Sequence, residues 1–78
     1  MSHTLLRLPA VKARCGYSRS TIYLRIAQGL WTRPVSLGAR SVAWPDSEVL
    51  ALNAARVAGK NETQIRALVS ELHAARGQ

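Results

Sequence analysis

Four hydroxyl groups and a guanidinium occupy five of six consecutive positions in the first third of the chain. The residues are Ser18, Arg19, Ser20, Thr21 and Tyr23. Hydroxyl groups donate hydrogen bonds to phosphate oxygens, and a guanidinium matches the O6 and N7 acceptors of guanine. The segment is therefore equipped to recognise a nucleic acid. Arg19 is its best candidate for contact with a base edge or, in the alternative, for clamping a phosphate.

A helix is expected to present these side chains. Ser18 is a favourable N-cap, and Gly29 is expected to end the helix just after Gln28. Ile22 and Ile26 lie four residues apart and mark the buried face. The side chains of residues 19, 20 and 23 then point outward. No acid stands in the first turn, where a carboxylate would repel a phosphate.

A shorter helix, expected over residues 9–14, precedes this one. Pro9 suits its first turn, where a backbone N–H has no intrahelical partner to lose. Val11 and Cys15 fall on one face, and Gly16 breaks the helix as a left-handed residue. Two helices separated by such a turn are typical of a helix-turn-helix, whose second helix enters the major groove of DNA.

A β-hairpin is expected after the second helix. Residues 35–37 and 41–44 alternate between apolar and polar, with a glycine-bearing turn at residues 38–40. The alternation predicts one shared face made by Val35, Leu37, Val42 and Trp44. Arg40 in the turn is placed to enter a minor groove or contact the DNA backbone, or is a solvated turn residue. The apolar lead-in at residues 5–8 is either a short strand or an extended segment packed on the core.

A third helix is expected to begin at Pro45. Asp46 and Glu48 lie in its first turn, where the helix dipole favours acids, and Gly59 is expected to stop it. Its apolar face is expected to comprise Val49, Leu50, Leu52, Ala54 and Val57.

A fourth helix is expected over residues 61–76. Asn61 is its N-cap, and Gln64 completes a capping-box pattern. Its apolar stripe at helical spacing consists of Ile65, Leu68, Val69, Leu72 and Ala75. This stripe either packs on the preceding domain or pairs with a second copy or another protein.

Excess positive charge is confined to the first part of the chain, and the net charge is +7. Residues 1–45 hold seven Arg or Lys and no Asp or Glu, whereas residues 46–78 hold four of each sign. A one-sided positive field suits a phosphate-backbone partner, although a solvated basic face or attraction to anionic lipid is compatible with the same count. Arginine outnumbers lysine nine to two, which favours bidentate contacts to phosphate and guanine.

Several classes of function are disfavoured. Cys15 is the only cysteine and the two histidines, His3 and His73, lie far apart in the chain, so neither a disulfide nor a metal site is expected. No catalytic constellation or glycine-rich phosphate loop is present, so neither an enzyme nor a cofactor is expected. No apolar run suits a signal peptide or a membrane span, and a cytoplasmic, nucleoid-associated protein is expected. Trp31 and Trp44 are expected in the core rather than as stacking platforms for single strands.

The order of motifs resembles the AlpA family, small regulators of phages and integrative elements. The resemblance covers residues 5–57 and is carried by Leu6-Arg7-Leu8-Pro9, Gly16, Ser18-Arg19-Ser20-Thr21-Ile22-Tyr23, Arg33-Pro34-Val35, Leu37-Gly38-Ala39-Arg40, Val42-Ala43-Trp44 and Ser47-Glu48-Val49. It implies a MerR-like winged helix-turn-helix, mainly α with a small β-hairpin wing, over residues 1–58. A C-terminal helix would follow over residues 59–78. It also implies sequence-specific binding to double-stranded DNA at a promoter or attachment site, as a transcription regulator, an excisionase (a recombination directionality factor), or both.

The resemblance implies roles for individual side chains. By position, those expected to lie in or beside the major groove are Ser18, Arg19, Ser20, Thr21 and Tyr23. From their place and charge, Arg25, Arg33, Arg40 and Lys12 are expected to contact DNA as well. Tyr23 bonds a phosphate or only covers the helix surface, and Thr21 contacts DNA or only caps the helix. Many family members carry Arg then Leu after the tyrosine, whereas here the order is Leu24-Arg25. Residue 25 is nearer the buried face, so Arg25 is expected to extend to a phosphate rather than to a base.

Two further kinds of partner stay open. For an excisionase, the resemblance implies self-association on tandem sites and a possible integrase partner. From a different class, the basic half could form a protein-interaction module for an acidic partner.

Overall fold

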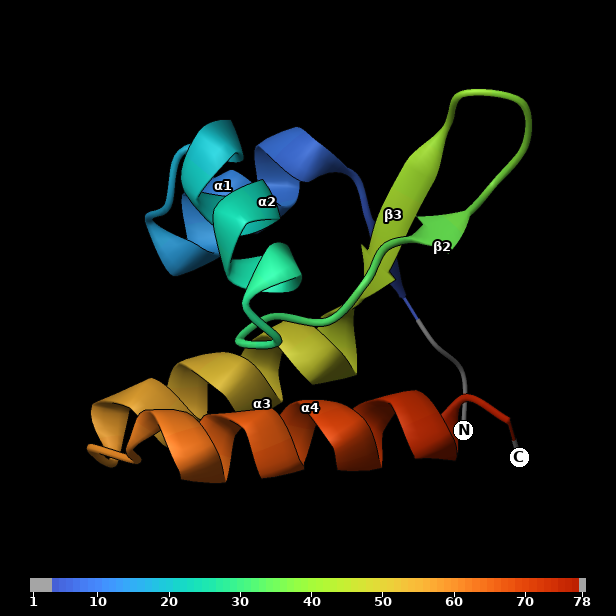
Figure 1. The fold of residues 1–78 in the computed structure, drawn as a ribbon. Helices are drawn as coiled ribbons and strands as arrows, with labels where there is room; N and C mark the ends of the chain where they lie inside the picture. Colours follow the sequence, from blue (N-terminus) through green and yellow to red (C-terminus); the bar gives the residue numbers. More distant parts are fainter. Residues whose placement is uncertain (1–3, 78) are drawn as a thin grey trace.

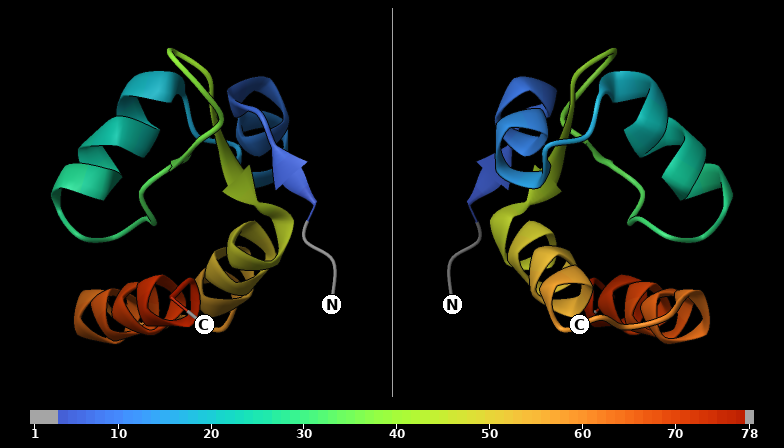
Figure 2. Two further views of the ribbon diagram at one scale, coloured as in Figure 1. Left: turned by 90° about the vertical axis from the view of Figure 1, so that its right-hand side faces the viewer. Right: turned by 90° about the vertical axis from the view of Figure 1, so that its left-hand side faces the viewer.

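The computed structural model describes residues 4–77, in which two short helices and a β-hairpin stand on a layer of two longer helices (Figure 1). The elements are β1 (Leu5–Leu6), α1 (Leu8–Cys15), α2 (Arg19–Ala27), β2 (Val35–Ser36), β3 (Val42–Pro45), α3 (Asp46–Val57) and α4 (Glu62–Ala75). Figure 2 shows α1, α2 and the hairpin tip together above α3 and α4. This mainly α fold with a small antiparallel sheet confirms the predicted class and is compatible with a winged helix-turn-helix.

The turn between α1 and α2 forms as its local sequence predicts. Gly16 adopts a left-handed conformation at φ 77°, and its N–H donates to the carbonyl of Lys12 at 2.9 Å. A side chain at this φ would be strained, which explains the glycine. Ser18 is the N-cap of α2, and its hydroxyl accepts from the backbone N–H of Thr21 at 3.3 Å. The start of α2 is therefore fixed relative to α1.

The sheet has β3 at its centre, with β1 and β2 antiparallel on either side. Val35 lies opposite Ala43, and the backbone N–H of Leu37 donates to the carbonyl of Ser41 at 2.7 Å. Residues directly opposite share a face, so Val35 and Leu37 lie on the face of Ala43. Val42 and Trp44 lie on the other face. The predicted common face for the four apolar residues is therefore wrong, because the three-residue turn pairs residue 37 with residue 41.

The core lies where the sheet, α2 and the lower helices meet. Its buried members are Leu6, Val11, Ile22, Trp31, Trp44, Val49, Leu52 and Val69. Both tryptophans belong to it, as expected, and Trp44 Nε1 donates to the carbonyl of Thr32 at 2.9 Å. Burying such side chains stabilises a fold by about 1.5–3 kcal/mol each, which matters in a chain of this size.

The apolar face predicted for α3 is wrong in part. Its buried residues are Glu48, Val49, Leu52 and Ala55. Leu50 and Val57 are 55% and 90% exposed, and Ala54 is also exposed. Apolar side chains occur nearly all round this helix, so packing against α1, β3 and α4 selects the face that is buried.

Helix α4 packs along α3 and contributes Val69 to the core. Its capping box is present, since Asn61 and Gln64 exchange side-chain-to-backbone hydrogen bonds of 2.8 and 3.0 Å. Of the predicted stripe, the three residues packed beside Val69 are Ile65, Leu68 and Leu72. Ala75 at the end of the stripe is exposed.

Candidate nucleic-acid interface

The outer face of α2 carries most of the side chains singled out from the sequence. Ile22 is fully buried, so the helix turns its other sides outward. We define the recognition surface as Ser18, Arg19, Ser20, Thr21, Tyr23 and Leu24, all exposed except the half-buried Thr21. The Ser18 hydroxyl also bonds Thr21 Oγ1 at 3.0 Å and lies 3.3 Å from Ser20 Oγ. Ser18 and Thr21 are therefore engaged in capping, whereas Arg19 and Tyr23 bear their polar groups further out.

A column of side chains connects the core to Arg19. Trp44, buried on β3, meets the ring of Tyr23 edge to face, with centroids 6.3 Å apart. The guanidinium carbon of Arg19 in turn lies 5.5 Å from the centroid of the Tyr23 ring. Cation–π contact of this kind is worth about 0.5–1 kcal/mol at an exposed site. The column gives the exposed Arg19 side chain a preferred position before any ligand arrives.

Leu24 is a member of the recognition surface that the sequence analysis did not propose. It is 57% exposed and lies on α2 well away from the buried Ile22. An exposed leucine at this place can make apolar contact with a thymine methyl group. Helix period alone could have identified it, since residue 24 is two positions from Ile22 and faces outward.

Arg25 lies away from the recognition surface. It is half-buried, and its guanidinium carbon stands 5.7 Å from the centroid of the Tyr17 ring. Arg56 of α3 approaches the same ring at 4.4 Å. Arg25 therefore faces inward toward α3 and is not grouped with Arg19, and its predicted contact with a phosphate stays a prediction.

Arg40 is exposed in the turn of the hairpin, and Figure 1 shows this turn beyond the ends of β2 and β3. The turn is held by the hydroxyl of Ser36, which accepts from the N–H of Gly38 at 3.4 Å. Gly38 has φ 146°, a value that side chains rarely allow. Arg40 thus projects from a constrained turn at the same upper end of the molecule as α2.

Arg33 is exposed, and its backbone is fixed by the end of α4. Its N–H donates to His73 Nε2 at 3.0 Å, and its carbonyl accepts from Arg76 at 2.6 Å. Nε2 can accept only when it carries no proton. Burial lowers the pKa of His73, and the charges of Arg33 and Arg76 lower it further against the opposing effect of Glu48. Lys12, the remaining predicted contact, is exposed on α1.

Three of the four carboxylates in the described part of the chain pair with cations. Asp46 pairs with Arg14 at 2.8 Å, Glu48 with Arg76, and Glu62 with Arg66 at 3.8 Å. Within residues 4–77, none of these ion pairs uses an arginine predicted to contact DNA, namely Arg19, Arg25, Arg33 or Arg40. Their charges are available to an external anion.

The family model described as Prophage CP4-57 regulatory protein (AlpA) matches residues 4–51. The chain belongs to the AlpA family. The match covers β1 through the first half of α3 and so includes the recognition surface and the hairpin of this AlpA protein. The family identification made from the motifs is confirmed, and with it membership of a family of phage regulatory proteins.

A relative of this AlpA protein is found in Enterobacteria phage P4. The protein, named "Uncharacterized protein ORF88", is 53% identical over 55 residues, which are 70% of this chain and 62% of that protein. The matched region thus spans less than two thirds of the relative's length. A search of the solved structures gave no match.

Two other findings concern residues 4–77 of this AlpA protein. No helix there has the length and apolarity needed to cross a membrane. No three His, Cys, Asp or Glu side chains in that range are grouped so as to hold a metal ion.

Proposed function

We propose that this AlpA protein binds double-stranded DNA in a sequence-specific manner. Helix α2 enters the major groove, and the hairpin tip contacts the minor groove or the backbone. The observation that carries the proposal is the recognition surface itself. It is exposed, contains no acid, and has its helix start capped by Ser18 and its arginine held on Tyr23.

Each side chain has a proposed role. Arg19 contacts a guanine edge through two hydrogen bonds, and Ser20 bonds a phosphate or a base. Tyr23 donates its hydroxyl to a phosphate while its ring supports Arg19. Arg40 contacts the minor groove or a phosphate. Backbone phosphates are the proposed partners of Arg33, Lys12 and Arg25.

We assign the DNA-binding activity to control of a phage, prophage or integrative element. Membership of a family of phage regulatory proteins supports this assignment. The protein acts as a transcription regulator at promoters, as an excisionase at attachment sites, or as both, because both roles begin with specific binding and differ in the site that is bound. A cytoplasmic location follows from the proposed target.

A selection from random DNA duplexes tests the proposal and identifies the bound sequence in the same experiment. The enriched duplex and a scrambled one are then titrated by fluorescence anisotropy at several salt concentrations. About five phosphate contacts predict a log–log salt slope of roughly −4 to −5. If no sequence is enriched and no duplex is bound, the DNA-binding proposal is wrong, and capture of an acidic protein becomes the better account of the basic surface.

Two assays on the same bound site separate the biological roles. A promoter fused to a reporter measures regulation, and recombination between the element's attachment sites with its integrase measures excision. An excisionase raises excisive recombination in the second assay whatever it does in the first. Binding to adjacent sites that is tighter than to either alone would show self-association.

A further inference from the structure

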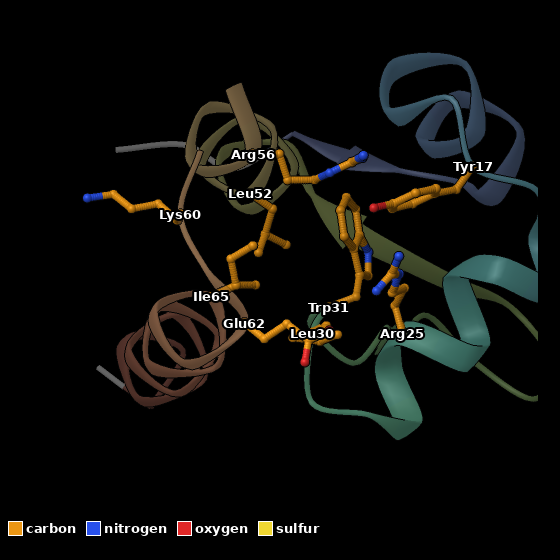
Figure 3. A pocket seen from close by; sticks show the side chains of 9 residues that line it. All are labelled: Tyr17, Arg25, Leu30, Trp31, Leu52, Arg56, Lys60, Glu62 and Ile65. Atoms are coloured by element: carbon orange, nitrogen blue, oxygen red, sulfur yellow. The ribbon is translucent and has the colours of Figure 1, made fainter. Parts of the chain in front are cut away.

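A pocket of about 200 Å³ lies on the side of the molecule, between α2, the segment that follows it, and the corner joining α3 to α4 (Figure 3). Arg25 enters it from α2 and Arg56 from the end of α3, whereas Lys60 at the corner lines its rim with the ammonium group pointing away (Figure 3). Glu62 is the one acid among its lining residues. Cations thus predominate around a concave site that the recognition surface does not include.

The two arginines share one aromatic neighbour, Tyr17, and have no carboxylate partner within residues 4–77. Figure 3 shows the Tyr17 ring between their side chains, and their guanidinium carbons lie 5.7 and 4.4 Å from the ring centroid. Glu62 stands 3.8 Å from Arg66 and pairs with that residue. Both guanidiniums therefore carry charge that no carboxylate in this range neutralises, and an anion that reaches them from the pocket would supply the missing partner.

Trp31 adds a second, independent sign of a missing acceptor. Its side chain is 1% exposed, and its Nε1 is buried without a hydrogen-bond partner in the described part of the chain. In Figure 3 the indole nitrogen faces the guanidinium of Arg25, so one donor faces another. Buried N–H groups normally have an acceptor, as Trp44 does in the carbonyl of Thr32.

We propose that this pocket binds a phosphate group. Its oxygens accept from the guanidiniums of Arg25 and Arg56. Once the Arg25 side chain shifts within the pocket, they also accept from Trp31 Nε1. Arginine forks match the geometry and charge of phosphate, and charge-assisted hydrogen bonds of this kind are the strong ones. The phosphate comes from a free phosphorylated small molecule or from the backbone of bound DNA. Only the second source rests on the proposed function.

The two tryptophan indole N–H signals allow a direct test by NMR of the ¹⁵N-labelled protein. Inorganic phosphate is titrated first, and a short random-sequence duplex is titrated separately in phosphate-free buffer. The Trp31 indole signal is expected to shift saturably and downfield as Nε1 gains an acceptor. The Trp44 signal is the internal control, because its N–H is already bonded to Thr32.

Matched variants connect the shift to the pocket. Arg25→Gln with Arg56→Gln is expected to weaken phosphate binding by about tenfold or more, since two charge-assisted contacts are lost. Glu62→Gln is expected to tighten binding. Arg7→Gln removes one charge from an exposed side chain outside the pocket and is expected to leave the titration unchanged.

Each result decides the matter. A Trp31 shift with inorganic phosphate establishes a site for a free phosphate ligand, even if the protein does not bind DNA. A shift with the duplex alone, lost in the double arginine variant, assigns the site to a backbone phosphate. If Trp31 responds to neither probe, or responds equally in the double variant, the inference is wrong. Such a result would not overturn the proposed DNA binding, which is tested separately by the selection from random duplexes.

Discussion

Arg76 donates from Nε to the Glu48 carboxylate at 2.7 Å, joining the end of α4 to the start of α3. The Glu48 side chain is 5% exposed, and a second guanidinium nitrogen of Arg76 bonds both this carboxylate and the carbonyl of Arg33. One side chain thus connects α4, α3 and the segment that leads into the hairpin. This connection supports the hairpin from below.

Arg76→Met is expected to destabilise the protein by about 3–5 kcal/mol, because it leaves a buried carboxylate without its partner. Urea unfolding followed by circular dichroism measures the change. The double variant Glu48→Met with Arg76→Met removes both charges and should recover most of the loss. A single variant within about 0.5 kcal/mol of the parent would show that the ion pair contributes little.

Stability should fall as the pH is lowered past neutrality, because His73 must stay neutral to accept from Arg33. Burial and the neighbouring arginines lower the pKa of His73 from its usual 6.5, so the unfolded chain takes up this proton at a higher pH than the folded protein. The stabilisation that His73 contributes is therefore complete above its pKa in the unfolded chain. It is lost as the pH falls toward the lower pKa of His73 in the folded protein. Urea midpoints measured between pH 8 and pH 5 should show the loss. His73→Gln supplies an acceptor that does not titrate, so the urea midpoint of this variant should change less with pH. A midpoint that falls with pH as steeply as in the parent would show that another group causes the loss.

Substitutions at Tyr23 separate its hydroxyl from its ring. Tyr23→Phe keeps the support beneath Arg19 and is expected to weaken all DNA sequences alike, by about 1.5–3 kcal/mol for one hydrogen bond to a charged group. Tyr23→Ala removes the ring as well and should also reduce sequence preference. Anisotropy titrations on the selected and scrambled duplexes measure both the affinity and the sequence preference of each variant. Equal loss of preference in the two variants would contradict a supporting role for the ring.

Arg19→Ala and Arg40→Ala each remove one positive charge and so serve as controls for each other. Arg19→Ala is expected to cost about 1–3 kcal/mol on the selected duplex and to relax specificity at one base pair. Arg40→Ala should weaken specific and random duplexes equally if it contacts phosphate. Equal losses on both duplexes for Arg19→Ala would make Arg19 a phosphate contact instead.

Leu24 is expected to favour thymine at one position of the selected site. Replacing that thymine with deoxyuridine removes only the methyl group, and affinity should fall by about 0.5–1 kcal/mol, close to the value of one buried methylene. Leu24→Ala should weaken binding to the thymine duplex by the same amount. This variant should bind the thymine and deoxyuridine duplexes equally. If the parent protein does not distinguish the two duplexes at any position, Leu24 makes no such contact.

Features governed by near neighbours could be predicted from the sequence. Ser18 and its partner Thr21 are three residues apart, as are Asn61 and Gln64, so each cap is decided within one helical turn. The outward direction of Arg19 on α2 follows from helix period in the same way. None of these features depends on tertiary packing.

Features set by distant contacts could not be predicted in this way. The hairpin register depends on how the turn pairs Leu37 with Ser41, which alternation within each strand does not reveal. Leu50 and Ala55 are both apolar, and only the positions of α1, β3 and α4 decide that Ala55 is the buried one. Glu48 and its partner are 28 residues apart, so its burial carries no local signal. For the site, the inward orientation of Arg25 was predictable, but its shared contact on Tyr17 was not.

Most acids of residues 46–78 pair with arginines, and this pairing also affects how quickly the protein would find a DNA target. Three of the four carboxylates lie beside internal cations, so a polyanion approaching α2 meets little opposing charge. Fields of this kind raise association rates by about 10 to 1,000-fold at low salt and weaken as ions screen them. Under the proposed DNA binding, the protein would then be captured at almost any point along a duplex. It would reach its site by travelling along the polymer rather than by repeated collisions from solution.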